Sequence, residues 1–165
     1  MSEAWARQFM LLITESYIKG ENKMTVNQVS VFIENRQGRL GEVLQVLKDN
    51  DINILSISLA DTTEYGLLRL IVNRPTEAKN VLLEAGFSSM LTEVLIIKVP
   101  HVSGSLQNIL SAIAKANVSI EYMYGLSVES TDASIVMKTN ELEEACEVLR
   151  NIHINTMTSQ EIASL

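Results

Sequence analysis

The chain lacks the residues that build disulfide, metal and nucleic-acid sites. Its 165 residues include a single cysteine, Cys146, which excludes an internal disulfide and any multi-cysteine metal site within one chain. The 13 Lys and Arg residues are scattered, and with 20 Asp and Glu the net charge is −7. Because phosphate binding needs a clustered basic surface, nucleic acid is not an expected partner. This cysteine usage fits a reducing, cytoplasmic setting.

Long apolar runs are also missing. The run from Phe9 to Ile13 is too short to span a membrane and lacks the flanks of a secretory signal, so no membrane partner is expected. Residues 1–23 have two interpretations: an accessory extension or upstream in-frame segment, or a docking helix, since apolar residues recur there at helical spacing. The composition, 47% hydrophobic and 20% charged, predicts a globular protein of one ordinary or two small domains.

The chain contains an internal repeat. Gly38 falls on Gly104, 66 residues later, when residues 33–55 are set over residues 99–121. The apolar positions are kept while the polar ones change, as the following pairs show: Leu40 and Leu106, Val43 and Ile109, Leu44 and Leu110, Leu47 and Ile113, Ile52 and Val118, Ile54 and Ile120. The repeat predicts two copies of one unit, residues 24–92 and 93–165, after an N-terminal extension of residues 1–23.

The period of the apolar residues predicts the elements of each copy. In copy one, strands are expected at 29–33, 53–59 and 67–72, with helices at 40–47 and 75–86, the second opened by Pro75 and closed by Gly86. The run 90–99 must hold the last strand of copy one and the first of copy two. In copy two, the expected strands are 94–99, 118–128, 133–138 and 154–162, and the helices are 105–116 and 141–151. This order, β-α-β-β-α-β, predicts an α+β fold of two ferredoxin-like units, with antiparallel sheets side by side and helices on one face.

The first strand-to-helix turn has the features of an anion site. Gly38 gives the turn its torsional freedom, and the first N–H groups of the following helix lie unpaired and point outward. Asn35, Arg36, Gln37 and Arg39 add side-chain donors. The alternative interpretation is an ordinary strand-to-helix turn, which shows glycine and polar residues in many folds.

Three stretches together resemble the ACT domain family: "FIENRQGRLGEVLQVLKDNDINI", "LADTTEYGLLRLIV" and "VLIIKVPHVSGSLQNILSAIAKANVSIEYMYG". Residues 24–165 resemble a tandem pair of such domains. ACT domains are small-molecule sensors, mostly for amino acids, which bind where the strand-to-helix loop faces a neighbouring domain. The resemblance implies one continuous eight-stranded sheet with ligand loops at the seam.

The resemblance also implies which residues bind. The positions that match the family's ligand loop and pocket in copy one are Asn35, Arg36, Gln37, Gly38, Arg39, Leu40, Asn53 and Ile54. Gln37 replaces the family's usual proline, and copy two departs further. The residues there that would form a second site or a wall of the first pocket are His101, Val102, Ser103, Gly104, Ser105, Leu106, Ser119, Ile120, Tyr122 and Tyr124. The first loop is thus expected to be the better equipped.

Several side chains outside the loops also carry expectations. Alternation places Ile120, Tyr122 and Tyr124 on one sheet face, and Ile54, Ser56 and Ser58 on one face of the equivalent strand. Cys146 lies on an apolar helical stripe and is expected to be buried, His153 should interact with a helix end, and Asp61 is a candidate to pair with Arg69 across a hairpin.

Two hypotheses for function follow. The first is a non-catalytic, allosteric sensor of a free amino acid or similar small molecule, expected to be a homodimer, which passes the signal on through its dimer geometry or through a metabolic enzyme partner. The second is an interaction-only subunit that dimerises and docks on an enzyme or regulator without a ligand. Catalysis is not expected, because the repeat brings together no nucleophile and base, no phosphate loop and no metal ligands. No cofactor and no metal are expected.

Overall fold

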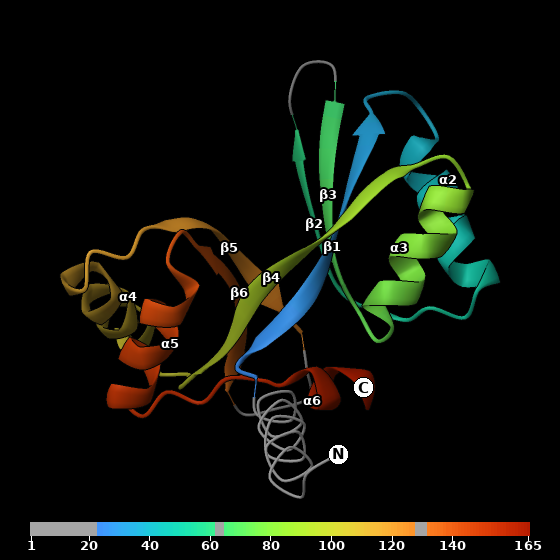
Figure 1. Ribbon diagram of the computed structural model, residues 1–165. Coiled ribbons are helices and arrows are strands. Elements are labelled where there is room, and N and C mark those ends of the chain that lie inside the picture. The colour runs from blue at the N-terminus through green and yellow to red at the C-terminus, as the bar shows by residue number, and fades with distance from the viewer. Residues whose placement is uncertain (1–22, 62–64, 128–131) are drawn as a thin grey trace, which may run out of the picture.

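The computed structural model describes residues 23–61, 65–127 and 132–165 (Figure 1). The strands are β1 (Thr25–Glu34), β2 (Ile54–Asp61), β3 (Tyr65–Val72), β4 (Ser88–Val99), β5 (Ile120–Leu126) and β6 (Ala133–Thr139). The helices of the described residues are α2 (Arg39–Asp49), α3 (Pro75–Glu84), α4 (Ser105–Lys115), α5 (Leu142–Asn151) and α6 (Ser159–Ala163). The strands form one six-stranded sheet in the order β2-β3-β1-β4-β6-β5, with antiparallel pairing throughout. No described helix is both long and apolar enough to span a membrane.

The sequence repeat is a structural repeat, as predicted. Gly38 and Gly104 precede α2 and α4 with φ values of 87° and 88°, a left-handed conformation that glycine adopts without steric cost. Pro75 is the first residue of α3, and Gly86, with a φ of 84°, follows that helix as its predicted C-terminal cap. The same glycine conformation therefore starts the equivalent helices α2 and α4.

The long strand β4 belongs to both copies. Its residues from Ser88 to Leu95 pair with β1, and its residues from Leu95 to Val99 pair with β6. The run predicted to hold two strands is thus one strand with two partners, and the proposed boundary between residues 92 and 93 falls inside it. In Figure 1 it runs diagonally between the two pairs of helices.

The prediction of a last strand over 154–162 is wrong. Only Thr156 forms a bridge, with Ile97, and the chain then turns into α6. The cause is a capping box: the Thr158 hydroxyl accepts from the Glu161 N–H while the Glu161 carboxylate accepts from the Thr158 N–H. Together with the shared β4, this explains why the described sheet has six strands and not the eight that the resemblance implied.

Both helix pairs cover the same face of the sheet. Val29 and Val31 of β1 pack under α2 and α3, and Leu95 and Ile97 of β4 pack under α4 and α5. Since Val29 pairs with Leu91, these alternate positions point to one side, as predicted. The opposite face has its own apolar cluster, which α6 joins through Ile162. Figure 1 shows the two pairs at opposite ends of the twisted sheet.

The alternation predicted for β2 and β5 is interrupted, because each strand has a β-bulge at an equivalent place. The register shifts between Ile54 and Ser56 and between Ile120 and Tyr122. Ile54 and Ile120 pack on the helix side, whereas the Ser56 hydroxyl and the Tyr122 ring lie on the other side. An extra residue on one strand reverses the face of the sheet to which the following side chains point. Neither predicted set of three side chains therefore lies on a single face.

The two edge strands approach each other across the face opposite the two helix pairs. The Ser56 hydroxyl of β2 donates to the Gly125 carbonyl of β5 at 2.7 Å. Leu55 and Tyr124, from the same two strands, pack against one apolar cluster. The sheet therefore coils until its two edge strands meet, and the face opposite the two helix pairs becomes concave.

Candidate functional site

The first strand-to-helix loop lies at the end of β1, with Gly38 as the residue before α2. No side chain caps this helix. The Arg39 N–H donates to the Arg36 carbonyl at 3.3 Å, but the backbone N–H groups of Leu40 and Gly41 have no acceptor among the described residues. The loop thus presents the unpaired donors that the sequence predicts.

The charged side chains of this loop bind one another. Arg36 contacts Glu34 at 3.0 Å and Glu42 at 3.1 Å, and Arg39 contacts Glu42 at 2.6 Å while its guanidinium stacks 4.2 Å from the centre of the Phe87 ring. The hydrogen bond from Arg39, followed by those from Arg36, lowers the pKa of Glu42. The arginines expected to meet a ligand therefore already bind carboxylates, and Glu42 occupies the positive end of α2.

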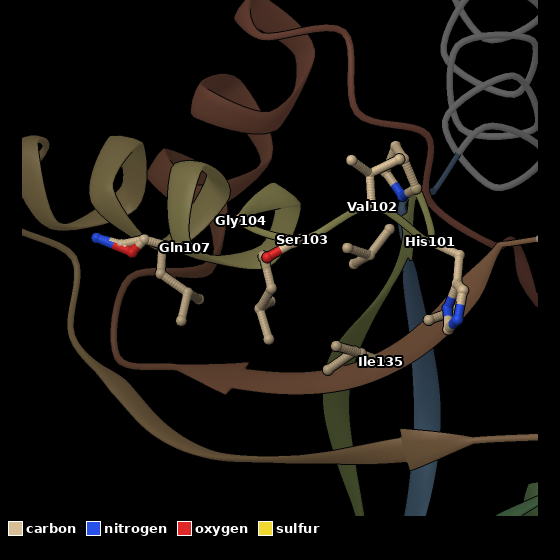
Figure 2. Close-up of a pocket in the computed structure, with 11 residues that line it drawn as sticks. His101, Val102, Ser103, Gly104, Gln107 and Ile135 are labelled. Carbon is tan, nitrogen blue, oxygen red and sulfur yellow. The ribbon is translucent and has the colours of Figure 1, made fainter.

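The second loop, in contrast, borders a cavity of about 740 Å³ (Figure 2). Gly104 precedes α4, no side chain caps the helix, and no acidic residue lies in its first turn. The backbone N–H groups of Leu106 and Gln107 have no acceptor among the described residues. The cavity is lined by Val99, Pro100, His101, Val102, Ser103, Gly104, Leu106, Gln107, Leu110, Ala133 and Ile135.

The two loops differ at the positions that carry charge. Under the 66-residue shift, Val102 takes the place of Arg36, Ser105 that of Arg39 and Asn108 that of Glu42. The second helix terminus therefore keeps the unpaired N–H groups without a competing carboxylate. Such a terminus favours an anion such as the carboxylate of an amino acid.

The structure brings together only part of each predicted set. His101, Val102, Ser103, Gly104 and Leu106 line the cavity, and the Ser105 N–H donates to the Val102 carbonyl at 3.1 Å. The other predicted residues of copy two lie elsewhere: Ser119 follows the far end of α4, Ile120 is on the helix side, and Tyr122 and Tyr124 are on the concave face.

Asn53 and Ile54 line a different hollow, of about 450 Å³, with Lys48 and Asp51. This hollow lies at the C-terminal end of α2, and the helix of 11 residues spans about 16 Å from the first loop. The Asn53 N–H donates to the Asn73 side chain at 3.1 Å, as the Ser119 N–H does to Asn140 at 2.8 Å. Within one chain, the two parts of the first predicted site therefore do not meet.

The structure also shows the surroundings of Cys146, His153 and Arg69, the candidate residues outside the loops. Cys146 is buried as predicted, and burial raises the pKa of its thiol. His153 follows α5 in a left-handed conformation with φ 57°, and its N–H donates to the Arg150 carbonyl. The Asp61–Arg69 pair stays a prediction, because the Asp61 side chain lies outside what the structure describes; in the sheet Asp61 pairs with Gly66, and Arg69 lies opposite Ser58 with its guanidinium over the Tyr122 ring. The described residues contain no group of His, Cys, Asp and Glu that could hold a metal ion.

Sequence reasoning missed six of the eleven residues that line the cavity. Pro100 and Gln107 directly flank the predicted loop, and Leu110 is the next turn of the same helix, so their positions were available from the repeat. Ala133 and Ile135 come from β6, which reaches the loop because it pairs with the second half of β4. That pairing has no local sequence signal.

Comparison with known proteins agrees with this architecture. A family model described as an ACT domain pair matches residues 24–165. Protein BT0572 from Bacteroides thetaiotaomicron is 32% identical, with a TM-score of 0.81 over 86% of this chain and 98% of that one. The ligand-free regulatory subunit of aspartate kinase from Thermus thermophilus is 19% identical, with a TM-score of 0.56 over 77% of this chain and 90% of that one, which shows a shared fold. No curated protein matches significantly. From the matched model and the repeated units, the chain belongs to the ACT domain family, as an ACT domain pair.

Proposed function

We propose that this ACT domain pair is a non-catalytic regulatory protein that binds a free amino acid beside a strand-to-helix loop. The observation that carries the proposal is the cavity at the second loop, where unpaired N–H groups of Leu106 and Gln107 coincide with a helix start free of acidic residues. These N–H groups would receive the ligand carboxylate. Leu110 and Ile135 would contact an apolar side chain, and His101 lies at the rim.

The first loop is the second proposed location. Asn35, Arg36, Gln37, Gly38, Arg39 and Leu40 would contact a ligand there, with Asn53 and Ile54 contributed by a neighbouring chain, because one chain keeps them apart. A ligand carboxylate would compete with Glu42 for the arginines, whereas a ligand ammonium would find Glu34 and Glu42.

A cytoplasmic homodimer that acts on a metabolic enzyme completes the proposal. Edge strand β2 leaves Ile57 and Leu59 about half exposed, at 48% and 50%, which suits an interface between two copies. A regulatory subunit of an enzyme, that of aspartate kinase from Thermus thermophilus, shares the fold, which supports an enzyme as the partner class.

Titration of the ¹⁵N-labelled protein with each common amino acid tests the proposal. We expect one amino acid to shift the amide signals of Gly104 and Leu106 in a saturable way, with isothermal titration calorimetry giving the affinity. Saturable shifts at Gly38 and Leu40 instead would place the ligand at the first loop. A folded protein that binds none of the amino acids at either loop would refute the sensor.

An interaction-only subunit is the alternative, and the first loop favours it, because its arginines are already neutralised by Glu34 and Glu42. Co-purification of a partner enzyme that persists after Asn35→Ala and Arg39→Ala, with no effect of any amino acid, would support this alternative. Loss of the partner when one amino acid is added would exclude it.

A further inference from the structure

The concave face of the sheet carries a polar pocket of about 400 Å³, away from both loops and lined only by strand residues. Its floor comes from β1, β3 and β4 through Ser30, Arg69 and Thr92, and its wall comes from β5 and β6 through Tyr122 and Lys138. The pocket exists because the coiled sheet brings the hairpin of copy two over the strands of copy one.

A hydrogen-bond network centred on the fully buried Gln28 side chain holds this floor in place. The Gln28 side chain donates to the Ser30 hydroxyl and to the Tyr122 hydroxyl, both at 2.9 Å, and accepts from the Tyr124 hydroxyl at 2.8 Å. Burial raises the pKa of Tyr124, so its hydroxyl stays protonated as the donor. A satisfied buried network of this kind fixes side-chain positions, which is what a binding site requires.

The Arg69 guanidinium has donors that no acceptor among the described side chains and backbone groups receives. Its guanidinium lies 4.0 Å from the centre of the Tyr122 ring, and the described residues offer it no hydrogen bond or ion pair. Lys138, opposite Tyr122 in the sheet, also has no ion pair among these residues. By contrast, Arg36, Arg39 and Arg74 each bind a carboxylate.

The charge of the pocket contrasts with that of the chain. Two cations, Arg69 and Lys138, face the cavity against one acid, Glu121, in a chain with a net charge of −7. A guanidinium held flat on a ring keeps its edge free for a planar, two-oxygen anion. The arrangement therefore selects a carboxylate.

The remaining wall is apolar. Phe32, Leu67 and Met90 line the pocket, and Phe32 and Met90 are 46% and 48% exposed. We propose that this pocket binds a small carboxylic acid with an apolar side chain, whose carboxylate pairs with Arg69 and whose side chain packs on Phe32 and Met90. The volume of about 400 Å³ suits a molecule of that size. This site is separate from the loop cavity and does not depend on the proposed function.

Methyl and amide NMR with two probes, 4-methyl-2-oxopentanoate and leucine, tests the site in the full chain. We expect saturable shifts of the Met90 methyl and Thr92 amide signals, while Gly104 reports the loop cavity separately. Tighter binding of leucine would mean that Glu121 receives an ammonium group, and tighter binding of the oxo acid would mean that the carboxylate and apolar groups suffice. Either result supports the pocket.

Variants decide the role of Arg69. Arg69→Gln should weaken binding at Met90 about tenfold or more, since a charge-assisted hydrogen bond is lost. Arg150→Gln, the same charge change at an exposed position of α5, should leave the affinity unchanged. If Arg69→Gln does not fold, Lys138→Gln replaces it and should also weaken binding. Absence of saturable Met90 shifts with both probes, or an unchanged affinity in the folded variant, would overturn the site whatever happens at Gly104.

Discussion

The two strand-to-helix loops share a backbone and differ in their chemistry. Gly38 and Gly104 have nearly the same φ, and both following helices lack a side-chain cap. Yet Glu42 sits on the start of α2 with two arginines, whereas Asn108 stands at the equivalent place in α4, beside an open cavity. The comparison teaches that the two copies keep the same backbone conformation, which each turn requires. Their side chains determine which helix start remains accessible to a ligand.

The largest effect should come from removing equivalent core residues. Leu82 of α3 and Leu149 of α5 are both fully buried, so Leu82→Ala and Leu149→Ala should each lower the free energy of unfolding by about 2–5 kcal/mol. Because β4 contributes to both helix-side cores, urea denaturation followed by circular dichroism should show one transition in each variant. Two separate transitions would show that the copies unfold independently.

Replacing the turn glycines tests whether the two backbones are energetically equivalent. Gly38→Ala and Gly104→Ala should each cost about 1–2 kcal/mol, because alanine is strained at positive φ although no atom lies near the added Cβ. Gly41→Ala, inside α2 and equally free of contacts, should instead stabilise by about 1 kcal/mol. Thermal unfolding measures all three, and unequal losses at Gly38 and Gly104 would break the equivalence.

The ends of the copies differ, and Thr158 tests that difference. Thr158→Ala removes the cap of α6 and should cost about 1 kcal/mol, whereas Thr76→Ala on the exposed face of α3 should have little effect. The hydrogen bond from the Thr158 N–H lowers the pKa of Glu161. The stabilisation by Glu161 is thus present above its ordinary pKa and is lost as pH falls through the lowered value. Denaturation at several acidic pH values should show a smaller pH dependence in Glu161→Gln.

The smallest effect comes from exchanging the charge at the helix starts. Asn108→Glu should stabilise α4 by about 0.3–1 kcal/mol through the helix dipole, and should weaken binding of an amino-acid carboxylate at the second loop about twofold to fivefold. Glu42→Gln is the reverse change in α2 and should make the first loop more receptive to a carboxylate. Calorimetric titration of both variants checks this, and tighter binding by Asn108→Glu would contradict the assignment of the carboxylate to that helix start.

Much of the fold was predictable because its signals are local. Gly38, Gly104 and Pro75 mark turns and helix starts through their own torsion angles, and the apolar repeat marks the faces they bury. The last strand was mispredicted because apolar residues near Thr156 outweighed the capping box that begins α6. The bulges in β2 and β5 have no local marker, since they depend on the partner strand.

The candidate site was predictable only in part. The loop around Gly104 follows from the repeat, but its open cavity needs β6, which is brought there by pairing with β4. The neutralisation of Arg36 depends on Glu42, six residues along and across a turn, and the placement of Arg69 on Tyr122 joins strands from different copies. Such contacts arise from the tertiary fold and not from residue spacing.

The two loops lie at opposite ends of the shared strand β4. Arg39 of the first loop stacks on Phe87, directly before β4, and Pro100 of the second loop directly follows it. The strand has 12 residues, an extended length of about 40 Å. Because a continuous strand and no flexible linker lies between the two loops, we do not expect them to move apart as two hinged domains would. Because β4 pairs with β1 in its first part and with β6 in its last part, we expect occupancy of one loop to change the affinity at the other.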